Sequence, residues 1–523
     1  MRLDARILLR WLSSAGTTLL LSACAVGPDY KRPSAPVPAA YTEQTPGATR
    51  PAAPAPTPAP SGEWKPAEPA DASARGKWWE AFGDPQLNAL EERVSVSNQN
   101  IVIAEAQYRN ARAVARGAKA EFFPTIAVAP GVTRSHAPIT RTSALPGAPA
   151  GTATTYQLVG DVSYEVDVWG RIRRTVESKV EAAQASAADL ETVRLSMHAE
   201  LAVDYFLLQG NDSERELLAS NVADDEKALQ LTVNRHAQGV VSGVDVAQAE
   251  TQLETTRAQL TELSITRAQL QNALAILVGE PPASFSIATA PAGAAPAEIP
   301  LELPSALLER RPDIAAAERS VASANAQIGV AQAAFFPALL LNATGGWEGG
   351  SLTRFFSAPN LLWSLGAALA QTIFDGGARI AGKEQAVAAY DATVAAYRQS
   401  VLGSFQEVED NLATLRFLTA ESAEQARAVA AARRALALAQ SRYQGGITTY
   451  LEVVTAEAAA LSNQRTAVDL ETRRLTASVG LIKALGGGWD ASSLPSPRAV
   501  LAKHETPPGG GRRTAELAAA PPQ

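Results

Sequence analysis

Side chains that could carry out chemistry are sparse in this chain. Its 523 residues include one cysteine, Cys24, and four histidines, which are scattered and show no metal-ligand spacing. The sequence has no G-x-S-x-G or H-E-x-x-H motif and no glycine-rich phosphate loop. Carboxylates are plentiful, but they lie on heptad flanks, where a solvated helix face explains them. These patterns argue against an enzyme and predict no metal or cofactor, apart from a covalent group on Cys24.

The cysteine closes an apolar run near the N-terminus. Three arginines precede that run and small residues end it, which is typical of a secretory signal peptide over residues 1–23. The run LSAC, Leu21 to Cys24, resembles the lipobox of bacterial lipoproteins, where the signal is cut before the cysteine and the thiol is lipidated. The following Ala25 favours the outer membrane as the place of anchoring. The alternative is an incidental cysteine within a signal peptide.

The composition favours long helices and excludes some partners. Alanine is abundant, only 19 % of residues are charged, and the formal net charge is −7. No concentrated basic block is present, so nucleic acid is not expected as a partner. After the signal, no stretch reaches the roughly eighteen apolar residues that a spanning helix needs. If the mature chain crosses a membrane, it must do so with strands that form a barrel.

The chain repeats itself. Residues 228–250 match residues 435–457, and the identical pairs include Arg235 with Arg442 and Gly239 with Gly446. The run AEFFPTIAV at 120–128 corresponds to AAFFPALLL at 333–341. Because the matching segments keep their order in both halves, they indicate a structural duplication.

This duplication predicts the domain organisation. A signal peptide (1–23) precedes a lipid-anchored, Pro/Ala-rich N-terminal tether (24–75), a first repeat (76–282), an inter-repeat linker (283–303), a second repeat (304–488) and a disordered C-terminal tail (489–523). Each repeat should hold a helix, two strands, a long helix and a return helix. The expected strands lie near 124–134, 155–169, 338–348 and 361–375, the long helices at 171–238 and 377–444, and the return helices at 243–279 and 449–486.

Heptad spacing and strand number bound the architecture. Apolar residues recur at spacings of three and four through 387–415 of the second long helix and through 246–277 and 454–482 of the return helices, which predicts coiled-coil packing. A run of about 67 residues at 1.5 Å per residue would be roughly 100 Å long. Four strands are too few to close a barrel, so they form either a soluble sheet or a barrel shared with other chains. Three copies would supply twelve strands.

These features together resemble the TolC-type outer-membrane efflux proteins, within the OprM/NodT-like lipoprotein branch. The resemblance rests on the lipobox, the two FFP helix ends, SYEVDVWGR at 163–171 and the paired R-x-x-x-G turns. It implies a homotrimer with a 12-stranded outer-membrane β-barrel, four strands per chain, continued by a periplasmic α-helical coiled-coil barrel. It also implies a passive tunnel that docks on a periplasmic adaptor and an inner-membrane RND-type pump and exports drugs or other small molecules.

The resemblance assigns a role to the turns between long and return helices. These tips would meet the adaptor and open by an iris-like movement of the helices. The residues carried over are Arg235, Gly239, Val240, Val244, Asp245 and Val246 at one tip and Arg442, Tyr443, Gly446, Tyr450 and Leu451 at the other. Two acidic positions of OprM-like sequences read Thr448 and Thr455 here, so a carboxylate ring at the entrance is not expected from them, although Glu452 or Glu457 could replace it.

Alternation along one predicted strand separates two kinds of side chain. In VGDVSYEVDVW, Asp161, Glu165 and Asp167 alternate with valines and a tyrosine, which suits a lumen face and a lipid face. A soluble amphipathic strand has the same period. Two other functions stay open: a type I secretion conduit in the outer membrane, and a lipid-anchored periplasmic coiled-coil scaffold.

Overall fold

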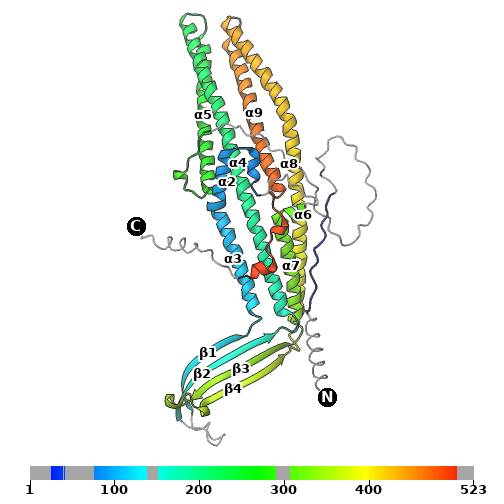
Figure 1. Cartoon of the computed structure of the whole chain (residues 1–523). Helices are drawn as coiled ribbons and strands as arrows, with labels where there is room; N and C mark the ends of the chain where they lie inside the picture. The colour runs from blue at the N-terminus through cyan, green and yellow to red at the C-terminus, as the bar shows by residue number, and fades with distance from the viewer. Residues whose placement is uncertain (1–24, 39–40, 42–75, 138–150, 290–306, 503–523) are drawn as a thin grey trace, which may run out of the picture.

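The computed structural model describes residues 25–38, 41, 76–137, 151–289 and 307–502 (Figure 1). A long bundle of helices leads at one end to two helical tips and at the other to a four-stranded sheet. None of the described helices combines the length and hydropathy required to cross a membrane. The predicted lipidation site, Cys24, lies outside the described residues, as do the signal peptide and most of the tether.

Both halves of the chain contain the same series of elements. The first half holds η2 (Trp78–Phe82), α2 (Pro85–Ser97), α3 (Gln99–Ala120), β1 (Thr125–Ala137), β2 (Gly151–Val166), α4 (Arg171–Ala237), α5 (Gly243–Leu277) and η4 (Pro282–Ser284). The second half holds α6 (Leu307–Arg310), α7 (Pro312–Ala333), β3 (Ala338–Gly349), η6 (Leu352–Arg354), η7 (Ala358–Asn360), β4 (Leu361–Ala370), α8 (Ala378–Gln444), α9 (Tyr450–Ala484), η8 (Ala491–Ser493) and α10 (Pro497–Leu501). The predicted fold class, mainly helical with four strands and an internal repeat, is confirmed.

The four strands form one antiparallel sheet in the order β1-β2-β3-β4. The pairing of β2 with β3 joins the two halves of the chain, because Ser163 is opposite Asn342. Within the described residues, β1 and β4 each have only one strand partner and so form the two edges of the sheet.

Helix α4 is the central element of the bundle. It packs against α3, α5, α7 and α9, whereas α8 packs against α7 and α9. The largest core cluster gathers around its middle, where Tyr205 and Phe206 are buried with Trp79 and Leu87. The rings of Phe82 and Phe206 lie 4.9 Å apart between centroids, so the short η2 segment is held onto α4 by aromatic packing.

Part of the predicted tether is packed against the helices. Arg174 of α4 donates to the carbonyls of Val26 and Gly27, and Asn325 of α7 donates to the Pro28 carbonyl over 3.0 Å. Tyr41 is buried in a cluster with Ile314, Tyr397 and Val401. Residues 25–38 and 41 of the predicted tether therefore lie along the bundle, where side chains of α4 and α7 donate to the carbonyls of residues 26–28.

The start of the predicted tail is also folded. Helix α10 places Val500 in a fully buried position beside Ala115, Val180 and Ala183. Arg112 of α3 donates to the carbonyls of Ala499, Val500 and Ala502, at distances from 3.1 to 3.2 Å. The expectation of disorder was therefore wrong for residues 489–502, since apolar packing and hydrogen bonds from Arg112 and Gln184 hold them onto the bundle.

Candidate functional site

The two helix tips lie together at the end of the bundle that is farthest from the sheet (Figure 1). They share one turn geometry. The Gly239 N–H donates to the His236 carbonyl over 2.8 Å, and the Gly446 N–H donates to the Tyr443 carbonyl over 3.0 Å. Both glycines have φ near +70°, at 74° and 72°, a conformation that a side chain disfavours. These are the two glycines that the internal repeat pairs.

A carboxylate stabilises the start of α5 and reaches the other tip. Ser242 and Asp245 form a reciprocal capping box at the first turn of α5. The Asp245 carboxylate also accepts from the backbone N–H of Tyr450 over 3.4 Å. Although partial burial acts against it, hydrogen bonds from Ser242 and Tyr450 lower the pKa of Asp245. The carboxylate therefore links the two hairpins in its charged form.

The strongest link between the tips joins Arg235 of α4 to Tyr443 of α8. The Arg235 guanidinium donates to the Tyr443 carbonyl over 2.9 Å and lies 4.8 Å from the centre of its ring. Tyr443 in turn meets the Tyr450 ring edge-on at 5.3 Å, and both tyrosines are buried. Three predicted tip residues from three different helices are thus in one contact chain.

The neighbouring Arg442 does not join this chain. Its guanidinium forms an ion pair of 2.7 Å with Glu452 of α9, and the Thr448 hydroxyl donates to the same carboxylate. The Thr455 hydroxyl instead donates to the Leu451 carbonyl within α9. A carboxylate does lie beside Thr448, but Arg442 neutralises its charge.

Apolar side chains cover the outer surface of the tips. Val240, Val244 and Leu451 are 59 %, 65 % and 55 % exposed, while Val246 is half-buried. Ile447, which the sequence reasoning missed, is 72 % exposed. The repeat could have identified it, because Ile447 follows Gly446 as Val240 follows Gly239. The tips therefore present an unpaired apolar surface, which we call the tip patch: Val240, Val244, Ile447 and Leu451.

Beneath the tips, two buried carboxyl groups meet between α4 and α9. Asp225 and Glu457 are 1 % and 5 % exposed and hydrogen bond to each other, and the Thr256 hydroxyl donates to Asp225 over 2.8 Å. The other Asp225 oxygen, Oδ1, has no donor among the described residues. Burial first, and then the charges of Asp225 and the nearby Asp224, raise the pKa of Glu457, and burial also raises that of Asp225. A shared proton accounts for this contact between two acceptors.

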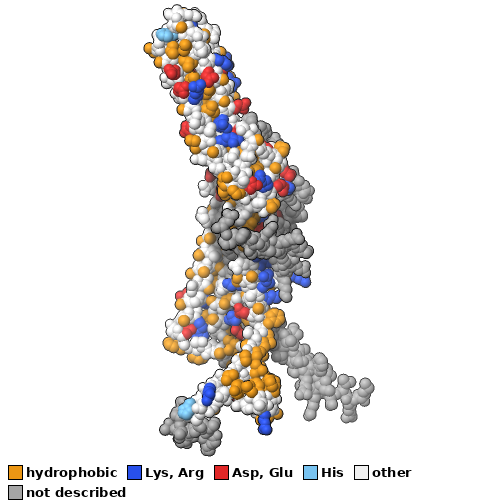
Figure 2. All heavy atoms as spheres, turned by 90° about the vertical axis from the view of Figure 1, so that its left-hand side faces the viewer, with side chains coloured by type: hydrophobic (Ala, Val, Ile, Leu, Met, Phe, Trp, Pro, Cys, Tyr) orange, Lys and Arg blue, Asp and Glu red, His pale blue; other side chains and the backbone are white. Residues whose placement is uncertain are grey.

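The sheet has two chemically different faces. Paired residues across neighbouring strands point to the same side. One row holds Ile126, Val162, Ala343 and Leu365, and the next row, on the opposite side, holds Ala127, Asp161, Thr344 and Ser364. Figure 2 shows hydrophobic side chains gathered over the region of the sheet. On the polar face, the Thr344 hydroxyl donates to Asp161 over 2.8 Å.

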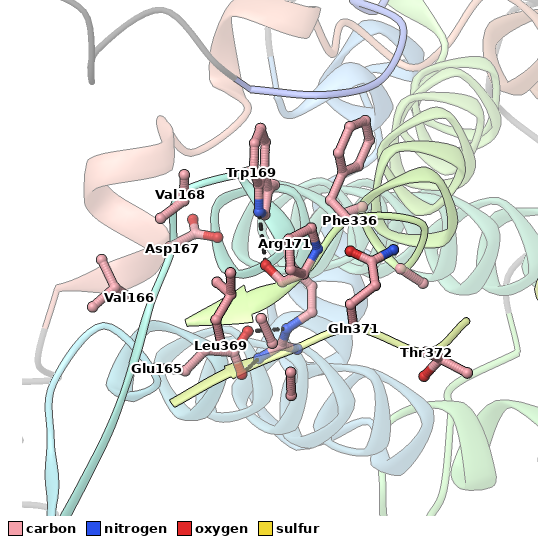
Figure 3. A pocket seen from close by; sticks show the side chains of 15 residues that line it. Glu165, Val166, Asp167, Val168, Trp169, Arg171, Phe336, Leu369, Gln371 and Thr372 are labelled. Carbon is pink, nitrogen blue, oxygen red and sulfur yellow. Dashed lines mark hydrogen bonds and ion pairs between the residues drawn. The ribbon is translucent and has the colours of Figure 1, made fainter. Parts of the chain in front are cut away.

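The SYEVDVWGR motif forms the joint between the sheet and the helices. Figure 3 shows a pocket of about 620 Å³ at this joint. The Trp169 indole donates to the Pro337 carbonyl over 2.8 Å, and its ring stacks on Phe336 at 4.8 Å. Arg171 binds both oxygens of Glu165, at 2.8 and 2.9 Å. The joint thereby connects the two repeats.

One acidic residue of this motif does not face the sheet surface. Strand β2 ends at Val166, and Asp167 accepts from the backbone N–H groups of Ile172 and Arg173 at the start of α4. The expectation that Asp167 belongs to the polar strand face was wrong, because it caps a helix.

Known proteins are similar to this chain in sequence and in fold. A family described as outer membrane efflux protein matches residues 90–280 and 303–487. The pyoverdine export outer membrane protein OpmQ of Pseudomonas aeruginosa is 34 % identical over 426 residues, which cover 80 % of this chain and 89 % of the relative. The toluene efflux pump outer membrane protein TtgC of Pseudomonas putida is 30 % identical over 480 residues, which cover 91 % of this chain and 95 % of the relative.

Solved structures extend this similarity to the fold. The outer-membrane channel OprN superposes with a TM-score of 0.78 at 29 % identity, covering 89 % of this chain and all of that channel. The outer membrane protein VceC of Vibrio cholerae gives 0.73 at 30 % identity, covering 79 % of this chain and 99 % of that protein.

Proposed function

Because this chain belongs to the family of outer membrane efflux proteins, we propose that three copies of it form one passive tunnel that exports drugs or other small molecules. The chain is the outer-membrane channel component of an efflux pump and a transport protein, not an enzyme. In the proposed assembly, a periplasmic adaptor and an inner-membrane RND-type pump deliver the cargo to the helix tips. The energy then comes from the inner-membrane partner, so the channel needs no cofactor.

The observation that carries the proposal is the sheet. Its edge strands β1 and β4 are free to pair, and one face is apolar while the other is polar. Closing such sheets edge to edge satisfies the edge N–H and C=O groups and turns the apolar faces towards lipid. Three copies give twelve strands, within the range of outer-membrane barrels.

The helices supply the periplasmic part of the tunnel. Both long helices have 67 residues, or about 100 Å at 1.5 Å per residue. We infer that the entrance lies at the tips, where Arg235, Tyr443 and Tyr450 hold the two hairpins of one chain together. Breaking these contacts would let the hairpins move apart in an iris-like opening.

The tip patch is the proposed contact with the adaptor. Its four apolar side chains are too exposed to stabilise the single chain, and apolar patches of this kind mark sites of protein association. The neighbouring residues Gly239 and Gly446 fix the shape of the turns that present it.

The N-terminal segment supports the proposed lipid on Cys24. The Val26 N–H donates to the Trp169 carbonyl over 3.0 Å, so the described chain begins at the joint between sheet and helices. A lipid attached two residues earlier would enter the membrane beside the proposed barrel. The protein would then extend from the outer membrane into the periplasm.

Relatives favour small molecules as cargo over secreted polypeptides. Those named above are described as exporting pyoverdine and toluene. The test is a deletion of the gene followed by a panel of antibiotics, solvents and siderophores, together with a gel of unheated outer membranes. We expect hypersensitivity to small molecules, restored by the gene in trans, and a heat-sensitive trimer. A monomer outside the outer membrane, or a defect confined to protein secretion, contradicts the proposal.

A further inference from the structure

The apolar face of the sheet ends in a group of aromatic side chains. This face contains Val162 and its partners across the sheet, and it continues along each strand at every second residue. At the end of the sheet farthest from the helices it holds Tyr156, Trp347 and Trp363. The ring of Phe356, in the loop after β3, meets Trp347 edge-on with centroids 5.3 Å apart. Aromatic side chains gather in this way where a membrane-spanning strand reaches the lipid headgroups.

Beyond this aromatic group, the apolar face becomes basic. Arg134 of β1 lies two residues after Val132, the strand partner of Tyr156, so its side chain is on the same face. His136 follows two residues later on that face. None of the paired residues of this face on the helix side of Arg134 carries a charge. The acidic side chains of the four strands all lie on the opposite face: Asp161, Glu165 and Glu348.

The two basic residues are exposed and have hydroxyl groups beside them. The Nδ1 atom of His136 lies 3.0 Å from the Thr152 hydroxyl, and Thr154 is the strand partner of Arg134. Within the described ranges, the Arg134 guanidinium has no ion pair. Figure 2 shows basic and histidine side chains at this end of the molecule, beyond the hydrophobic side chains of the sheet. We call these four residues the rim site: Arg134, His136, Thr152 and Thr154.

The position of the rim site along β1 matches the boundary of a membrane. The strand begins at the joint with Thr125, so nine residues, 125–133, precede Arg134. A strand crosses the hydrocarbon core with about 9–11 residues. In the proposed channel the helix tips reach into the periplasm, so the opposite end of the sheet lies at the outer surface. The rim site is then level with the headgroups of the outer leaflet, on the side that faces lipid.

The chemistry of the rim site fits a phosphate-bearing glycolipid. A guanidinium binds a phosphate through two parallel N–H donors, and this charge-assisted contact is stronger where water is scarce. The second ring nitrogen of His136 and the two threonine hydroxyls can hydrogen bond to phosphate or sugar oxygens. The adjoining apolar face offers a surface for acyl chains. The headgroup thus supplies the negative charge that the described residues of this face lack.

We propose that the rim site binds a phosphate group of a phosphorylated glycolipid in the outer leaflet of the outer membrane, with its acyl chains against the neighbouring aromatic and apolar side chains. This inference rests on the proposed function, since the apolar face must be the one that contacts lipid. It assigns a lipid of defined headgroup chemistry to a surface that would otherwise only exclude water.

Lipid retention tests the site. The full chain is placed in phosphatidylcholine nanodiscs with a small fraction of bis-phosphorylated lipid A, dephosphorylated lipid A or phosphatidylglycerol, and native mass spectrometry counts the lipids that stay bound. We expect wild type to retain bis-phosphorylated lipid A several-fold more than either of the other two. Arg134→Gln/His136→Gln should lose this preference, whereas Arg134→Lys, which keeps the charge, should retain part of it.

The matched control is Thr133→Gln/Ser135→Gln, which places the same side chains on the polar face of the same strand and should bind lipid A as wild type does. Equal retention of all three lipids by wild type overturns the assignment. Unchanged lipid A retention in the Gln double variant, with a less stable trimer, overturns it too, because Arg134 then pairs with a group of the protein. Both outcomes leave the channel proposal standing, whereas wild type that is a monomer or lies outside the outer membrane contradicts the proposed function itself.

Discussion

At the scale of single residues, the interior just below the tips is polar where a coiled coil is usually apolar. Asp225, Thr256 and Glu457 occupy buried positions there. In the sequence, Thr256 is only a polar residue at a heptad position where an apolar one is expected. No spacing rule pairs Asp225 of α4 with Glu457 of α9. The family resemblance did predict Tyr443 and Arg235 as tip residues, but their mutual contact depends on how the hairpins pack, which sequence patterns do not specify.

The carboxyl pair predicts a pH-dependent stability. Its pKa values are raised in the folded state, so the protonated pair is favoured and stability is lost as the pH rises from about 4 through the folded pKa values. In Glu457→Gln, the amide N–H can donate to the Asp225 carboxylate, so the contact no longer requires a carboxyl proton. We expect this variant to gain roughly 1–3 kcal/mol at pH 8 and little at pH 5.

Thermal unfolding in detergent at pH 5 and pH 8 measures the difference. Glu254→Gln, on the exposed side of α5, is the matched control and should keep the wild-type pH dependence. A Glu457→Gln protein whose stability falls between pH 5 and pH 8 as much as that of wild type would falsify the shared proton.

At the scale of elements, the helices were the most predictable part of the molecule. The internal repeat and the turns that contain Gly239 and Gly446 predicted long helices at 171–238 and 377–444, within one residue of the limits of α4 and α8. The FFP runs correctly predicted the ends of α3 and α7, since a proline ends a helix. Short elements were not predictable. The five residues of α10 are too few to show a helical period, and the burial of Val500 and the hydrogen bonds from Arg112 hold them in place.

The tip patch carries a prediction for the two turns. We expect Val244→Asp and Leu451→Asp to lower drug resistance several-fold while leaving the trimer intact, because exposed substitutions change stability by only about 0.5 kcal/mol. A carboxylate in the patch opposes burial against an apolar partner. Val244→Leu keeps the surface apolar and should retain resistance. Minimal inhibitory concentrations and unheated gels provide the two measurements, and normal resistance in both Asp variants contradicts the docking role.

At the scale of the whole molecule, the N-terminal segment ties the two repeats together. Arg174 of the first repeat holds the carbonyls of residues 26 and 27, while Asn325 of the second holds that of Pro28. Gly329 lies so near Gly27 that a Cβ added to Gly27 would come within 2.5 Å of the Gly329 backbone. From the Pro/Ala-rich composition of residues 24–75, the sequence predicted only a tether. Composition does not reveal that side chains of α4 and α7 donate hydrogen bonds to the carbonyls of the N-terminal segment.

Lipidation of Cys24 is tested on the whole protein. We expect Cys24→Ala to lose labelling by radioactive palmitate and to keep its signal peptide, which raises its mass on a gel. Trimers should still form if the sheet and helices suffice for assembly. Cys24→Ala protein that matures and localises as wild type does would contradict the lipobox interpretation.

The matched lengths of the two hairpins restrict which insertions and deletions the protein can accept during evolution. Both long helices have 67 residues and both return helices have 35. Adding one heptad to each helix of a single hairpin would displace its tip by about 10 Å relative to the other. Such a shift would separate Arg235 from Tyr443. Insertions that alter the reach of this protein are therefore expected to survive only as matched pairs, at equivalent places in both halves of the gene.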